Sequence, residues 1–88
     1  MLEYYNNITK TLTIPYDFNN VLKDIPYDTE IIIFDEDDIN DIYSYFNQEI
    51  KKNILPELLH ILTFDYEFNQ EIKKECIAKI YMFLKVLY

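Results

Sequence analysis

The sequence predicts an α+β fold in which a repeat-built part with short strands is followed by a C-terminal helix. Three observations lead to this class. The heptapeptide FNQEIKK occurs twice, at residues 46–52 and 68–74. Two segments nearer the N-terminus are rich in β-branched residues, and the C-terminal segment carries apolar residues at helical spacing. We expect a single small domain over residues 1–88, because a chain of this length buries one modest core.

The first strand is expected within ITKTLTI, residues 8–14, where apolar and polar residues alternate until Pro15 ends the pattern. A second strand is expected within TEIIIF, residues 29–34. Its apolar run is unbroken, which is typical of a strand with both faces covered. The N-terminal third of the chain therefore predicts two short strands.

Two helices are expected farther along the chain. The first is capped by Asp37 or Asp38 and continues through Asp41 to Lys52. Its apolar stripe consists of Ile39, Ile42, Tyr43, Phe46 and Ile50. The second covers about residues 69–87, with apolar residues at steps of four and three. Its stripe consists of Ile72, Cys76, Ile80, Phe83 and Leu87.

The repeat extends beyond its seven identical letters. A shift of 22 residues also pairs Leu62 with Leu84 and Phe64 with Val86, so the apolar pattern persists after the letters diverge. In the other direction, LTIPYDFNN at 12–20 is similar to LTFDYEFNQ at 62–70. These matches predict a structural unit that recurs along the chain.

The pattern FNQ-x-I, LP, L-x-x-L-T-F and again FNQ resembles the FNIP repeat, a relative of the leucine-rich repeat. Counted generously, the resemblance covers residues 8–74. The chain departs from the family at Asp65, where Gly is usual, and at Glu49 and Glu71, where Pro is usual. An acidic insertion, about residues 35–45, also separates Phe34 from Phe46. The matching residues are Phe46, Asn47, Gln48, Ile50, Leu55, Pro56, Leu59, Leu62, Thr63, Phe64, Phe68, Asn69, Gln70 and Ile72.

The resemblance implies a short leucine-rich-repeat-like solenoid of two to three coils, with the C-terminal helix as its cap. It also implies that Asn19, Asn47 and Asn69 bond backbone groups across coils. The alternative is a small β-α domain with a helical-repeat-like C-terminal half, because the leucines between residues 54 and 64 also fit helical spacing. The sequence leaves open whether residues 54–64 form a strand-bearing coil or a helix. The leucines concerned are Leu55, Leu58, Leu59 and Leu62.

Composition restricts the function. Sixteen acids against eight lysines give a net charge of −8, and the absence of Arg makes nucleic-acid binding unexpected. Cys76 is the single cysteine, and no apolar run is long enough to cross a membrane, so we expect an intracellular protein, cytoplasmic by default. The acidic run FDEDDIND lacks the Gly and Glu of a calcium loop, and His60 is the single histidine. We predict no catalytic residue, no metal site and no cofactor.

The sequence therefore favours a non-enzymatic protein–protein interaction module of the FNIP-repeat type. Its expected surface is acidic and bears tyrosines, which suits a protein partner and fits a basic one. The alternative is a small acidic inhibitor or immunity-type protein that blocks a basic active site or nucleic-acid-binding groove. Neither hypothesis sets an oligomeric state. The expected contact residues are Asp35, Glu36, Asp37, Asp38, Asp41, Tyr43 and Tyr45.

Overall fold

The computed structural model describes residues 1–37, 39–51, 53–64, 67–71 and, for the backbone alone, 81–84. A short 3-10 helix, η1 (Leu2–Tyr4), precedes the strands in the chain. The strands are β1 (Tyr5–Asn6), β2 (Thr11–Ile14), β3 (Ile31–Phe34), β4 (Ile61–Phe64) and β5 (Tyr81–Leu84).

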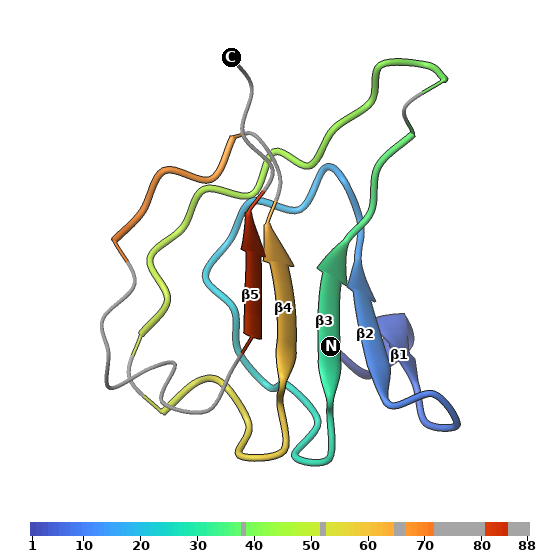
Figure 1. Ribbon diagram of the computed structural model, residues 1–88, viewed down its shortest axis with the longest axis vertical. Helices are drawn as coiled ribbons and strands as arrows, with labels where there is room; N and C mark the ends of the chain where they lie inside the picture. The colour runs from blue at the N-terminus through green and yellow to red at the C-terminus, as the bar shows by residue number, and fades with distance from the viewer. Residues whose placement is uncertain (38, 52, 65–66, 72–80, 85–88) are drawn as a thin grey trace.

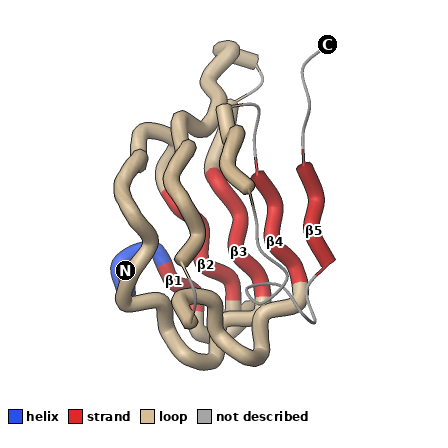
Figure 2. Tube along the Cα trace, turned by 90° about the vertical axis from the view of Figure 1, so that its left-hand side faces the viewer, coloured by secondary structure: helices blue, strands red, loops and turns tan. Residues whose placement is uncertain are grey.

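The five strands form one mixed sheet in the order of the chain (Figure 1). β1 is antiparallel to β2, whereas β2, β3, β4 and β5 are successively parallel. Figure 2 shows the sheet along one side and the long connections along the other. The β2–β3 connection and the described part of the β3–β4 connection therefore return the chain across the same face of the sheet, and the core lies between the two layers.

The predicted α+β class is wrong. The described residues contain no helix of seven or more residues, and they form sheet and coil. The predicted C-terminal capping helix conflicts with β5, which lies inside residues 69–87. The rest of that helix, at 72–80 and 85–87, lies outside the described residues. The predicted helix from 41 to 52 is also absent from the described part, where the chain is coil.

Residues 54–64 contain a strand, so the helical-repeat alternative is wrong as well. The three four-residue strands whose side chains are described, β2, β3 and β4, alternate between inward and outward residues. This period of two places one side of each strand in the core. The inward residues are Leu12, Ile14, Ile32, Phe34, Leu62 and Phe64, each at most 7% exposed.

The outward face of the sheet is not covered as the TEIIIF run predicted. Ile31 and Ile33 are half-buried, as are the outward threonines of the neighbouring β2. No described segment crosses that face in Figure 2. The continuous apolar run of β3 therefore reflects one fully buried side and one side shielded mainly by adjacent strands.

The strand ladder does not follow the shift of 22 residues. Leu62 pairs with Met82 and Phe64 with Leu84, a shift of 20. The same shift joins β2 to β3, while β3 and β4 are 30 residues apart. The shift of 22 applies instead at the Phe-Asn pair of each repeat, which we call the corner. There the backbone N–H of Asn69 donates to Asn47 Oδ1. The repeated heptapeptide marks that corner and not the strand.

Phe46 is the centre of a stack of aromatic rings in the core. Its ring lies nearly parallel to those of its repeat equivalents, at centroid distances of 6.4 Å from Phe18 and 5.9 Å from Phe68. It also stacks on Phe34 from β3, at 4.6 Å, and on Phe64 from β4, at 6.4 Å. Phe46 is only 2% exposed. This one residue thus connects three corners and two strands.

The predicted asparagine ladder is confirmed for the side chains of Asn19 and Asn47. The amide N–H of Asn47 donates to Asn19 Oδ1 at 2.9 Å, and the amide N–H of Asn69 donates to Asn47 Oδ1 at 2.8 Å. The glutamines reinforce it, because Gln48 Nε2 reaches Asn19 Oδ1 at 3.0 Å and Gln70 Nε2 reaches Asn47 Oδ1 at 3.1 Å. Each corner is therefore bonded to the one before it.

Asp and Asn occupy left-handed backbone positions in this chain, which contains no Gly. Asp24 (φ 54°) and Asn53 (φ 65°) stand shortly before Pro26 and Pro56 in successive coils. Their short polar side chains lower the steric cost of positive φ. The corresponding bends thus form without glycine.

Substitution of Phe46 by Ala should lower the free energy of unfolding by about 3–5 kcal/mol, because it removes a ring from the centre of the core. Urea denaturation measures the change. Ile39→Ala is the control, since Ile39 is 94% exposed. A loss below about 1 kcal/mol for Phe46→Ala would contradict the central position of this ring.

Substitution of Asn47 by Ala should cost about 1–3 kcal/mol, because Asn69 N–H and Gln70 Nε2 lose their acceptor. The matched control is Asn20→Ala, at an exposed asparagine next to the ladder. Urea denaturation should separate the two variants. Equal stability of both would show that the ladder contributes nothing measurable.

Candidate interaction surface

The acidic segment projects from the sheet at the carboxyl ends of the parallel strands (Figure 1). We call residues 35–37 and 39–45 the acidic projection; Asp38 lies outside the described residues. Twelve positions separate the end of β3 from Phe46, whereas four separate β2 from Phe18 and β4 from Phe68. The projection therefore occupies the place where the other described coils turn directly into the corner.

Asp37 organises the tip of the projection. Its backbone exchanges two hydrogen bonds with Ile42, at 2.7 and 2.8 Å. Its carboxylate accepts hydrogen bonds from the amides of Ile39 and Asn40 and from Asn40 Nδ2. Asp41 closes the turn with φ 53°. The projection is thus a bonded turn with defined geometry.

The hydrogen bond from Asn40 is the main reason that the pKa of the Asp37 carboxyl lies below its usual value. The backbone N–H groups of Asn40 and Ile39 act in the same direction, and partial burial opposes them. Bonds to the ionised form stabilise it. Asp37 therefore remains a carboxylate at neutral pH and contributes to the negative charge of the projection.

Tyr45 and Tyr16 form an exposed aromatic pair at the base of the projection. Their rings are edge-to-face, with centroids 6.0 Å apart, and Tyr45 N–H donates to the Tyr16 carbonyl at 2.8 Å. Tyr45 is 55% exposed and Tyr16 39%. The pair is held by the backbone, so its rings are presented at little conformational cost.

The predicted contact residues differ in accessibility. Asp35, Asp41 and Tyr45 are exposed, whereas Glu36, Asp37 and Tyr43 are half-buried. Sequence reasoning missed Ile39, which is 94% exposed at the tip, and the pairing of Tyr16 with Tyr45. The helix predicted after a cap at Asp37 or Asp38 had placed Ile39 on its apolar stripe. The position of Ile39 within an acidic run was the signal for an exposed residue.

Within the described part of the chain, no three of the His, Cys, Asp and Glu side chains gather as metal ligands would. None of its helices has the length and apolarity that a bilayer crossing requires.

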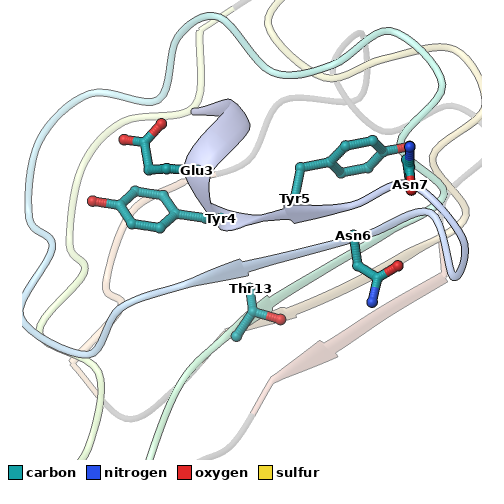
Figure 3. Close-up of a pocket in the computed structure, with 6 residues that line it drawn as sticks. All are labelled: Glu3, Tyr4, Tyr5, Asn6, Asn7 and Thr13. Carbon is teal, nitrogen blue, oxygen red and sulfur yellow. The ribbon is translucent and has the colours of Figure 1, made fainter.

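A shallow hollow of about 520 Å³ lies beside β1 and is lined by polar groups (Figure 3). The side chains of Asn6 and Thr13 lie on one side of the β1–β2 pair. The other lining residues come from η1, β1 and the turn that follows. They are Glu3, Tyr4, Tyr5 and Asn7.

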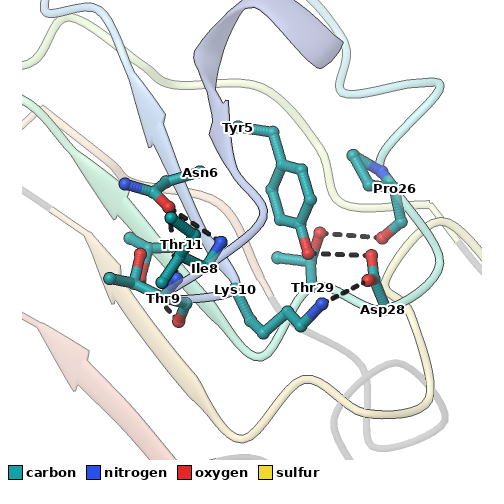
Figure 4. A network of polar contacts seen from close by, with 9 residues as sticks. All are labelled: Tyr5, Asn6, Ile8, Thr9, Lys10, Thr11, Pro26, Asp28 and Thr29. Carbon is teal, nitrogen blue, oxygen red and sulfur yellow. Dashed lines mark hydrogen bonds and ion pairs between the residues drawn. The ribbon is translucent and has the colours of Figure 1, made fainter.

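A polar network fastens β1 to the connection before β3 (Figure 4). The Tyr5 hydroxyl donates to Asp28 Oδ1 at 2.8 Å, and Lys10 Nζ contacts Asp28 Oδ2 at 3.0 Å. Partial burial, followed by the hydrogen bond to Asp28, raises the pKa of Tyr5 to about 12. The hydrogen bond from Lys10, followed by that from Tyr5, lowers the pKa of Asp28.

These geometries define a class of protein: stacked coils joined by a parallel ladder and by a repeated Phe-Asn corner. The family model described as FNIP Repeat matches residues 46–77. The chain therefore carries an FNIP repeat, and the resemblance predicted from its sequence is confirmed for this segment. No curated protein and no solved structure matches the chain.

The Tyr5–Asp28–Lys10 network should make stability depend on pH at both extremes. The pKa of Asp28 is lowered on folding, so its contribution is present above the ordinary carboxyl pKa and is lost as pH falls through the lowered value. The pKa of Tyr5 is raised, so its contribution is present below the ordinary phenol pKa and is lost as pH rises through about 12.

Asp28→Asn should abolish the loss of stability that the network predicts at acidic pH. It should also lower the pKa of Tyr5 partway toward its ordinary value; the shift is partial because the burial of Tyr5 remains. A ¹³C-tyrosine NMR titration and urea midpoints at acidic pH measure the two effects. Asp17→Asn, at an exposed acid in the turn after β2, is the control. An unchanged Tyr5 titration in Asp28→Asn would contradict the network.

Proposed function

We propose that the protein is a non-enzymatic protein–protein interaction module and that the acidic projection is its contact surface. One observation supports this most directly: a bonded turn presents exposed Ile39 among carboxylates, and exposed Tyr45 lies at the base of the same projection. Ile39 supplies apolar area at the tip, and the Tyr16–Tyr45 pair supplies aromatic area at the base. Aromatic and apolar groups with a charged rim are typical of protein interfaces.

The charge of the projection favours a partner with a basic surface. Asp35, Asp37 and Asp41 all belong to it, and the whole chain carries −8. Complementary charge accelerates encounter and selects among partners, while buried apolar contacts supply much of the affinity. The expected interface is therefore electrostatically steered and sensitive to salt.

The test is site-specific photo-crosslinking in an extract of cells that produce the protein. A benzophenone side chain at position 39 should capture a defined protein, and capture should weaken as salt rises. The same group at position 2 is the control, because Leu2 is 74% exposed but belongs to η1.

The variant Asp35→Asn/Asp37→Asn/Asp41→Asn should reduce capture at position 39 by about tenfold or more. Asn at position 37 keeps a side-chain oxygen that can accept the turn's hydrogen bonds, so the geometry is retained. Capture that is equal from positions 2 and 39, or that is insensitive to the triple variant, would contradict the proposal.

A further inference from the structure

Two equivalent β-turns lie next to one another at the end of the sheet where the parallel strands begin. Thr29 N–H donates to the Pro26 carbonyl and Leu59 N–H to the Pro56 carbonyl, both at 3.1 Å. Each turn leads into its strand, β3 or β4. In Figure 1 these connections lie at the bottom of the molecule, and the acidic projection lies at the top.

Each turn exposes a large apolar side chain at a central position. Tyr27 in the first turn is 85% exposed, and Leu58 in the second is 57% exposed. The helical alternative had placed Leu58 on a buried stripe, but the turn directs it outward while Leu59 enters the core at 2% exposure. At the same end of the sheet, Ile8 is 87% exposed in the hairpin between β1 and β2.

A hollow of about 640 Å³ lies between the two turns, and we call it the turn hollow. Ile25, Ile54 and Leu55 line it and also pack against the core, so these parts of the lining are fixed. Tyr27 and Leu58 complete the apolar lining. This size and lining suit the apolar side chains of a bound segment.

The charges around the turn hollow indicate which kind of partner can bind there. Among its described lining residues Glu57 alone is charged. Asp28, next to Tyr27, is already paired with Lys10 at 3.0 Å. A second copy of the chain would bring another −8, and an anionic membrane surface would also be repelled. A segment with apolar and basic side chains complements both the hollow and the charge.

We propose that the turn hollow is a second docking surface, which binds an amphipathic basic segment of a partner protein. Apolar side chains of that segment fill the space between Tyr27 and Leu58, and a lysine or arginine faces Glu57. This inference goes beyond the proposed function, because the turn hollow and the acidic projection lie at opposite ends of the sheet. One chain can then hold two partner segments at once.

The probe is a fluorescein-labelled 12-residue peptide of leucine and lysine, with binding followed by fluorescence anisotropy. One control peptide has serine in place of leucine and keeps the charge. Another has glutamate in place of lysine and keeps the apolar residues. The leucine–lysine peptide should bind about tenfold or more tightly than either control, because the site requires both properties.

Backbone amide NMR shifts locate the bound peptide. The largest changes should fall at 24–29 and 53–59, the segments that contain the two turns and the residues just before them. Tyr27→Ser/Leu58→Ser should weaken binding by about tenfold or more, since it removes the apolar contact. The matched control is Leu2→Ser/Val21→Ser, which removes two exposed apolar side chains that line neither the turn hollow nor the acidic projection, and it should change binding by less than about twofold.

Any one of five outcomes overturns the proposal. The serine–lysine peptide binds as tightly as the leucine–lysine peptide, which indicates charge alone. The shifts concentrate in the acidic projection, or the turn variant binds like the wild type. Concentration-dependent sedimentation that is lost in Tyr27→Ser/Leu58→Ser would assign the hollow to a second copy of the chain. Binding to neutral lipid vesicles that is lost in the same variant would assign it to a membrane. Crosslinking at position 39 is a separate readout on a different surface, so the failure of this proposal is distinguishable from the failure of the proposed function.

Discussion

The stacking of Phe46 against rings from other coils is the contact on which the fold depends. Short parallel strands of four residues supply few hydrogen bonds each, so the sheet needs a second layer to close its core. Phe46 provides it by joining the corners at Phe18 and Phe68 to the strand residues Phe34 and Phe64. The described parts of the long connections are thereby held against the sheet without any helix of seven or more residues.

The asparagine ladder supplies hydrogen-bond acceptors for backbone N–H groups at the corners. A coil that contacts its neighbours through irregular backbone must still satisfy its N–H groups. Asn19 and Asn47 do this at the corners with side-chain oxygens, while the rings beside them turn inward. Phe and Asn are thus adjacent in the repeat because one position faces the core and the next faces the following coil.

The sequence predicted the corner more accurately than the secondary structure. Identical letters at FNQ, with Phe18 and Asn19 as a third copy, located the ladder, and the structure adds that the repeated phenylalanines stack beside it. The helix predictions were wrong because apolar spacing of three and four residues also arises when one repeat unit passes through a strand, a corner and a turn. Leu58 shows the difference: its helical spacing to Leu55 and Leu62 is real, yet it is 57% exposed in a turn.

The surfaces were harder to predict than the core. Acidic residues marked the projection, but the hydrogen bonds of Asp37 and the exposure of Ile39 depend on how the extra residues close into a turn. The turn hollow depends on two connections 30 residues apart, and the repeat spacing of 22 does not bring them together. Such surfaces arise from coil stacking and leave little trace in local sequence.

Native-state hydrogen exchange tests the central claim most directly. The amides of Asn47 and Asn69 should exchange far more slowly than that of Asn20, although all three lie in coil, because only the first two donate to a ladder oxygen among the described residues. Asn19→Ala should accelerate exchange at Asn47 more than at Asn69. Equal rates at all three amides in the wild type would contradict the ladder and the stacked corners built upon it.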